Sequence, residues 1–90
     1  MTKDQLVEAV FAELRRAEEK FPGFPSDPIH ALAIVHEEVG EVAKATLEAC
    51  YEPHKANPAT VQKEAIQMAA MALRFALHLE HYNYTPAVST

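Results

Sequence analysis

The fold is decided by a long stretch in the second half of the chain, NPATVQKEAIQMAAMALRFALHLE (residues 57–80). Asn57 followed by Pro58 is a helix start signal, because Asn accepts from free first-turn amides and Pro fits the first helical position. The residues that follow are apolar nearly all round. The sequence therefore predicts a helix ending near Glu80 or His81 and buried on most of its sides.

A second helix is predicted upstream, starting near Ser26 or Asp27 with Pro28 in its first turn and running to about Tyr51, and a short polar loop at 53–57 turns the chain back into a hairpin. Asp27 before Pro28 is again a cap followed by a first-turn proline. Apolar or small residues recur at alternating steps of three and four, which is typical of a packing seam in a helical bundle. This predicted seam consists of Leu32, Val35, Val39, Val42 and Thr46.

An N-terminal helix is predicted over about 3–20, with Thr2 and Gln5 as a capping box. Its C-terminal turn, which carries Arg15, Arg16, Glu18, Glu19 and Lys20, is expected to be a solvated end. The segment FPGFP (21–25) then breaks the helix. We expect a single helical domain over 1–82 and a loosely ordered C-terminal tail over 83–90.

The expected fold class is all-α, a helical hairpin plus an N-terminal helix. Ninety residues form one domain with a modest core, and three helices can hardly enclose one that is apolar all round. The simplest solution is a homodimer that forms a four-helix-type bundle. The sequence does not distinguish a homodimer from a homotetramer.

The composition argues against several partners. A net charge of −5 does not favour a nucleic acid polymer or an anionic membrane, which need clustered Lys and Arg. The longest apolar run (65–79) is too short and too polar to span a bilayer. The N-terminus does not resemble a signal peptide, and the single Cys50 suggests a reducing compartment. We therefore expect a cytoplasmic protein, with Cys50 as a buried small apolar side chain.

The segment HEEVGE (36–41) carries three carboxylates, Glu37, Glu38 and Glu41, within one and a half helical turns. Helical geometry places Glu38 at the edge of the predicted seam and Glu41 one turn further on. Like charges at this spacing repel one another, and Lys44 is the nearby basic residue of this helix. A hard cation would convert the repulsion into coordination, because Mg²⁺ and Mn²⁺ prefer carboxylate oxygen. A solvated helix face is the alternative.

Glu64 lies in the middle of an apolar stripe of the last helix, because Met68 and Met71 fall on the same helical face, one on each side of it. Burying a lone ionised carboxylate costs several kcal/mol, so something must compensate its charge. A metal shared with the preceding helix would do so, and an ion pair with Arg74 or a lysine is the alternative. Arg74 flanks the same face and could itself meet a phosphate or a carboxylate.

Glu37-Glu38-Val39-Gly40-Glu41, followed further on by Glu64-Ala65-Ile66-Gln67, resembles the Glu-Glu-x-x-Glu … Glu-x-x-Asp motif of the MazG-like, all-α nucleoside triphosphate pyrophosphatases. The resemblance covers about 28–80. It implies a dimerising helical bundle that hydrolyses an NTP or dNTP to the monophosphate and pyrophosphate with Mg²⁺, or with Mn²⁺ in its place. By position, Glu38, Glu41 and Glu64 would be metal ligands. Glu37 would be a further ligand or the base that orients water, so that the four glutamates form the catalytic set.

Gln67 departs from this pattern, since the family has Asp there. A Gln carbonyl can coordinate a cation, but it adds no negative charge and cannot act as a base. Metal affinity should fall. The alternatives are therefore a catalytically weak or inactive module that binds nucleotide or metal, and a purely structural helical homo-oligomer.

Candidates for the substrate side of the site are fewer and less specific. Lys44, Lys63 and Arg74 could contact phosphates. An aromatic or imidazole ring could stack on a base, with packing as the alternative; the candidates are Phe21, Phe24, Tyr51 and His54.

Overall fold

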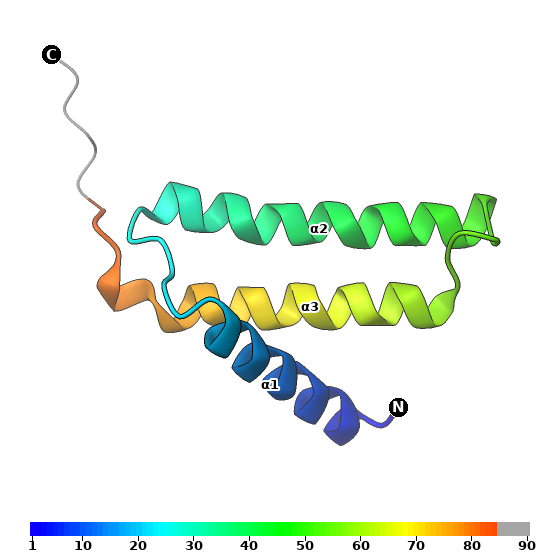
Figure 1. Cartoon of the computed structure of the whole chain (residues 1–90), viewed down its shortest axis with the longest axis horizontal. Coiled ribbons are helices and arrows are strands. Elements are labelled where there is room, and N and C mark those ends of the chain that lie inside the picture. The colour runs from blue at the N-terminus through cyan, green and yellow to red at the C-terminus, as the bar shows by residue number, and fades with distance from the viewer. Residues whose placement is uncertain (85–90) are drawn as a thin grey trace, which may run out of the picture.

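The computed structural model describes residues 1–84, which form three α-helices and one short 3₁₀-helix. These are α1 (Lys3–Lys20), α2 (Pro28–Tyr51), α3 (Pro58–Leu77) and η1 (Leu79–His81). No strand occurs among the described residues. Helices α2 and α3 run antiparallel side by side, and α1 crosses α3 obliquely (Figure 1). The predicted all-α hairpin with an N-terminal helix is confirmed.

The predicted helix starts are confirmed by their caps. The hydroxyl of Thr2 accepts from the amide of Gln5 at 3.1 Å, and the side chain of Gln5 accepts from the amide of Thr2 at 2.8 Å. The carboxylate of Asp27 accepts from an amide at 2.9 Å at the start of α2. Asn57 and Thr60 form a second capping box at the start of α3. Each cap satisfies first-turn amides that have no partner within the helix.

The end of α3 differs from the prediction. The α-helix stops at Leu77 instead of Glu80 or His81. The amide of His78 is shared between the carbonyls of Arg74 and Phe75, both at 3.2 Å, and the chain continues as η1. Such a tightening of the last turn is common at helix ends, and it moves the boundary by about one turn.

Small residues form most of the core. Among residues 1–84 no large side chain is fully buried, and the buried apolar side chains are Leu14, Ala17, Ala31, Ala45, Ala56, Ala70 and Tyr82. Helix α3 packs against both other helices, whereas α1 and α2 make no close backbone contact within the described residues. Alanines at a helix–helix contact allow the two backbones to approach closely, which leaves little room for larger side chains.

The face of α2 that meets α3 is rotated from the predicted seam. Ala31 and Ala45 are the buried residues of α2, while Leu32 and Val39 are 52% and 45% exposed. The predicted seam is therefore not the face with which α2 packs on α3, and Leu32 and Val39 stay exposed in the single chain. The rotation brings Glu38, predicted at the seam's edge, into a half-buried position.

Much apolar surface remains uncovered in the single chain. Large exposed side chains occur on every helix, and they include Val7, Phe11, Ile29, Leu32, Val39, Leu47 and Leu77. No described helix combines the length and the hydropathy that crossing a lipid bilayer requires. Cys50, in the last turn of α2, is exposed, contrary to the expectation of a buried thiol.

The residues that follow η1 are attached to the helices. Tyr82 is buried, and its hydroxyl donates to the carbonyl of Phe75 at 3.1 Å. The amide of Asn83 donates to the carbonyl of Ser26 at 2.9 Å, and the hydroxyl of Tyr84 donates to the carbonyl of Leu79 at 3.2 Å. The first two residues of the predicted loose tail are thus hydrogen-bonded, and 85–90 lie outside the described residues.

Candidate functional site

The predicted acidic cluster lies on facing parts of α2 and α3. Glu38 and Glu64 are half-buried, one on each helix, while Glu37 and Glu41 are exposed. The pKa of Glu38 is raised, first by burial and then by the negative charges of Glu64, Glu41, Glu37 and Glu13. The antiparallel hairpin therefore brings the two halves of the sequence motif within electrostatic range of each other.

The carboxylates do not converge on one point. In the described part of the chain, no group of three or more His, Cys, Asp or Glu side chains is arranged to hold a metal ion. The exposed side chains of Glu37 and Glu41 can change rotamer at little cost. A bound cation would therefore require these two side chains to turn toward Glu38 and Glu64.

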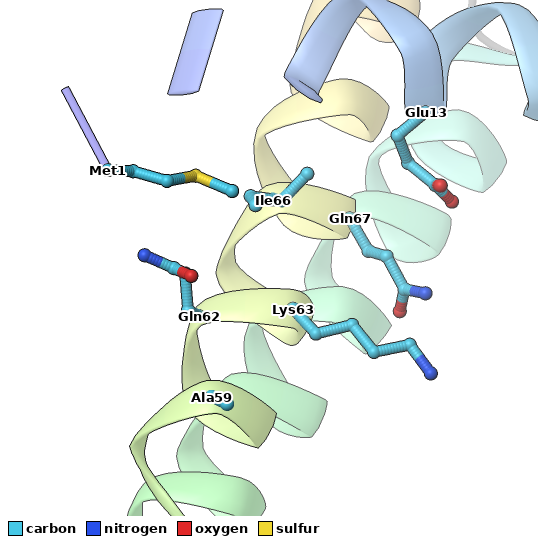
Figure 2. A pocket seen from close by; sticks show the side chains of 7 residues that line it. All are labelled: Met1, Glu13, Ala59, Gln62, Lys63, Ile66 and Gln67. Carbon is cyan, nitrogen blue, oxygen red and sulfur yellow. The ribbon is translucent and has the colours of Figure 1, made fainter. Parts of the chain in front are cut away.

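Gln67, one turn beyond Glu64 on α3, lines two neighbouring pockets. The first has a volume of about 230 Å³, and its lining includes Glu13, Lys63 and Gln67. Figure 2 shows these three side chains directed to the same side of α3. The second pocket, of about 150 Å³, lies between the three helices, and Glu13 and Gln67 line it together with Glu38. The two pockets thus meet at the positions of Glu13 and Gln67.

The second pocket also has a basic and an aromatic side. Arg16 and Lys20, one helical turn apart on α1, line it together with Phe21. The ammonium group of Lys20 lies 5.4 Å from the centre of the Phe21 ring. Cationic side chains from α1 therefore border the same space as the carboxylate of Glu38.

Glu13 and Arg16 form an ion pair with two contacts. Nε of Arg16 donates to Oε2 of Glu13 at 3.0 Å, and Nη2 donates to Oε1 at 2.5 Å. The Arg16 hydrogen bond lowers the pKa of Glu13, and the positive charge of Lys63 acts in the same direction. Both arginine contacts hold the guanidinium in one orientation beside the pocket.

Sequence reasoning missed Glu13 and treated Arg16 as part of a solvated end. Glu13 lies directly before buried Leu14 and one turn before buried Ala17. This spacing puts it at the margin of the stripe with which α1 packs on α3. A carboxylate at the margin of an apolar stripe could have marked Glu13 as a candidate site residue. Whether it lies at the site depends on where α1 crosses α3, which the sequence does not give.

Arg74 does not fit its predicted role in substrate binding. It is only 3% exposed, and its guanidinium donates to the carbonyls of Ala17 at 3.3 Å, Gly23 at 3.5 Å, and Phe21. The guanidinium carbon also lies 4.9 Å from the centre of the Phe24 ring. Arg74 therefore ties the end of α1 to α3, and it is not available to a phosphate or to Glu64.

The other substrate candidates are dispersed. Lys63 is exposed beside Gln67, but Lys44 is exposed on α2 and lines neither of the two pockets. Phe24 packs against Arg74 and against His78, at 5.0 Å between ring centres. Tyr51 and His54 are exposed around the α2–α3 loop, at the other end of the hairpin from the α1–α2 connection (Figure 1). Of the rings considered, Phe21 alone lines the second pocket.

Comparison of the chain with protein families, with curated proteins and with solved structures finds no match.

Proposed function

We propose that this protein is a Mg²⁺-dependent nucleoside triphosphate pyrophosphohydrolase of the MazG-like kind, which converts an NTP or dNTP to the monophosphate and pyrophosphate. The observation that carries the proposal is the position of Glu38, a half-buried carboxylate whose pKa is raised by burial and then by the negative charges of neighbouring glutamates. The charged form of such a group is disfavoured in the folded chain, and a cation bound beside it would relieve that penalty. The reaction class, hydrolysis of a nucleoside triphosphate to the monophosphate and pyrophosphate, is inferred from the resemblance of the Glu-Glu-x-x-Glu spacing to the MazG-like motif.

The proposed roles follow the two facing helices. Glu38, Glu41 and Glu64 hold the cation, and the amide oxygen of Gln67 is a neutral fourth ligand. Glu37 orients the attacking water or accepts its proton. When bound, Mg²⁺ neutralises the triphosphate and stabilises the charge that develops on the departing pyrophosphate.

A homodimer is part of the proposal. The exposed apolar side chains of α2, among them Leu32 and Val39, would be covered by a second copy of the chain. A core made largely of alanine gives a short chain little stability by itself, because a buried methyl group removes little apolar area from water. The second copy would supply the missing burial and complete a four-helix-type bundle.

A non-catalytic module that binds nucleotide or metal is the second candidate, favoured by Gln67. This residue borders both pockets next to Glu13, where a carboxylic acid would have added charge or a base. A site with Gln instead of Asp at position 67 has one negative charge fewer. This weakens the binding of a cation more than it weakens contacts to a nucleotide. A purely structural homo-oligomer is the third candidate, supported by the exposed apolar side chains alone.

The test is release of pyrophosphate from a panel of NTPs and dNTPs with Mg²⁺ or Mn²⁺, repeated with EDTA. We expect metal-dependent turnover that is lost in Glu38→Gln and kept in Glu18→Gln, a matched change at an exposed position of α1. No turnover of any nucleotide by the folded protein would overturn the enzymatic proposal. Calorimetric binding without hydrolysis would establish the second candidate instead.

A further inference from the structure

We infer that Arg16, held in position by Glu13, binds the phosphate chain of the nucleotide, so that α1 supplies the anion-binding side of the site. This inference rests on the proposed function for the identity of the substrate. It concerns two residues outside the motif that prompted that proposal. Its starting point is the pocket that α1, α2 and α3 line together.

Acidic and basic side chains line this pocket together: Glu38 from α2 and Glu13 from α1, Arg16 and Lys20 from α1, and the neutral Gln67 from α3. Glu13 is paired with Arg16, so Lys20 and the remaining donors of Arg16 supply the attraction for an anion on the α1 side. A polyphosphate is repelled by the carboxylates and attracted by the basic side chains. Its anionic end is therefore expected on the α1 side, while a cation bridges it to the α2–α3 side.

Arg16 has the donors that such a ligand requires. A guanidinium carries five N–H groups in a planar fork. Glu13 accepts from Nε and from Nη2 of Arg16, which leaves the Nη1 donors and the second Nη2 donor for another acceptor. The side chain of Arg16 is 56% exposed whereas that of Glu13 is 19% exposed, so a ligand can reach the arginine while its partner stays packed.

The ligand class is an extended polyphosphate. The second pocket alone, at about 150 Å³, is small for a whole nucleotide when typical small-molecule sites measure about 300–1,000 Å³. It can hold a phosphate group, and the adjoining pocket of about 230 Å³ extends the space past Lys63. Arg16 should therefore discriminate a triphosphate from a monophosphate and be indifferent to the base.

The test measures binding of Mg²⁺–tripolyphosphate, of a hydrolysis-resistant α,β-methylene NTP and of an NMP by calorimetry. Arg16→Gln should weaken binding of the first two ligands roughly tenfold, as expected for a charge-assisted hydrogen bond, and NMP binding less than about twofold. Arg16→Lys should be intermediate, because an ammonium keeps the charge without the fork. Arg15→Gln is the matched control: it removes the same charge from the preceding position of α1, and Arg15 lines neither pocket.

Glu13 is tested as a positioning residue by a double-mutant cycle. If it orients Arg16, the loss of tripolyphosphate affinity caused by Arg16→Gln is smaller in a Glu13→Gln background than in the wild type. Equal losses of affinity in both backgrounds would show that Glu13 does not position Arg16. Circular dichroism and melting temperature confirm that each variant is folded.

The outcomes separate the two proposals. Equal effects of Arg16→Gln and Arg15→Gln, or an equal loss of NMP affinity, would overturn the role of Arg16 even in an active enzyme. Tripolyphosphate binding that depends on Arg16, in a protein that hydrolyses no nucleotide, would support the anion site and refute the hydrolase. A wild-type protein that binds none of the three ligands would overturn both.

Discussion

Nη1 of Arg74, in the last turn of α3, lies 3.3 Å from the carbonyl oxygen of Ala17 in the last turn of α1. The same guanidinium reaches the carbonyls of Phe21 and Gly23, beyond the end of that helix. These contacts hold the chain where α1 leaves α3. The positions of Glu13 and Arg16 next to Glu38 therefore depend on a residue that touches none of the proposed ligands.

Arg74→Ala is expected to destabilise the fold by about 2–4 kcal/mol, because it removes charge-assisted hydrogen bonds and the packing of a side chain that is only 3% exposed. Arg74→Lys should cost nearly as much, since one ammonium cannot reach three separated carbonyls. Urea denaturation at fixed protein concentration measures both. Arg15→Ala, on the exposed side of α1, should change the free energy of unfolding by less than about 0.5 kcal/mol. A similarly small effect for Arg74→Ala would contradict the tethering role.

Glu38 predicts a pH dependence of stability in the metal-free protein. Its folded-state pKa is raised above the reference value of 4.5, so the folded state binds more protons than the unfolded state between the two values. Stability therefore falls as pH rises through that window, and the loss persists above it. Glu38→Gln should be more stable than the wild type at neutral pH by on the order of 0.5 kcal/mol. Near pH 3 the advantage should disappear, which chemical denaturation at several pH values would show.

Divalent metal should reverse this penalty. With Mg²⁺ at about 100 times its dissociation constant, binding to the folded state alone stabilises it by about 2.7 kcal/mol. We expect a raised melting temperature with Mg²⁺, reversal by EDTA, and a much smaller response in Glu38→Gln and Glu64→Gln. Glu18→Gln should respond like the wild type. An identical melting temperature with Mg²⁺ and with EDTA would count against a metal site.

Gln67→Asp should strengthen the proposed metal site. The change adds a negative charge where Gln67 lines the pocket with Glu38, and we expect tighter Mg²⁺ binding by roughly tenfold together with faster pyrophosphate release. Ala72→Asp is the control, because it adds the same negative charge at an exposed position of α3 that lines neither pocket. Equal effects of the two variants would indicate that net charge alone is responsible.

The oligomer prediction concerns the exposed face of α2. Leu32→Lys should shift the chain from dimer to monomer and lower its melting temperature, because a charge would be buried in the interface. Sedimentation equilibrium measures the change of mass, with Ala12→Lys at an exposed α1 position as the control for added charge. A wild-type protein that is monomeric at all accessible concentrations would refute the dimer.

Local signals predicted the helix starts well, whereas the contacts across helices were harder to predict. Thr2 with Gln5, Asp27 with Pro28, and Asn57 with Pro58 act within one turn, so their outcome does not depend on the rest of the chain. The face of α2 was misplaced because helical periodicity allows more than one stripe, and the choice depends on the helix that packs against it.

The candidate site shows the same division. The spacing of Glu37, Glu38 and Glu41 is visible in the sequence, but the proximity of Glu13 to Glu38 requires the crossing of α1 over the hairpin. Arg74 was misjudged for a similar reason, since the carbonyls it binds lie more than 50 positions away in the chain. Nucleotide hydrolysis, metal binding and dimerisation stay predictions.

The alanines between the helices have a consequence for how the sequence can vary. At Ala31, Ala45 and Ala70, which are at most 6% exposed, there is almost no side chain left to truncate. Larger side chains are expected to be the more damaging substitutions. Val or Leu at these positions would push the helices apart and move the carboxylates with them. Substitution to Gly would mainly cost helix propensity, about 1 kcal/mol. A deep mutational scan should therefore find the most restricted sites of this protein where its side chains are smallest.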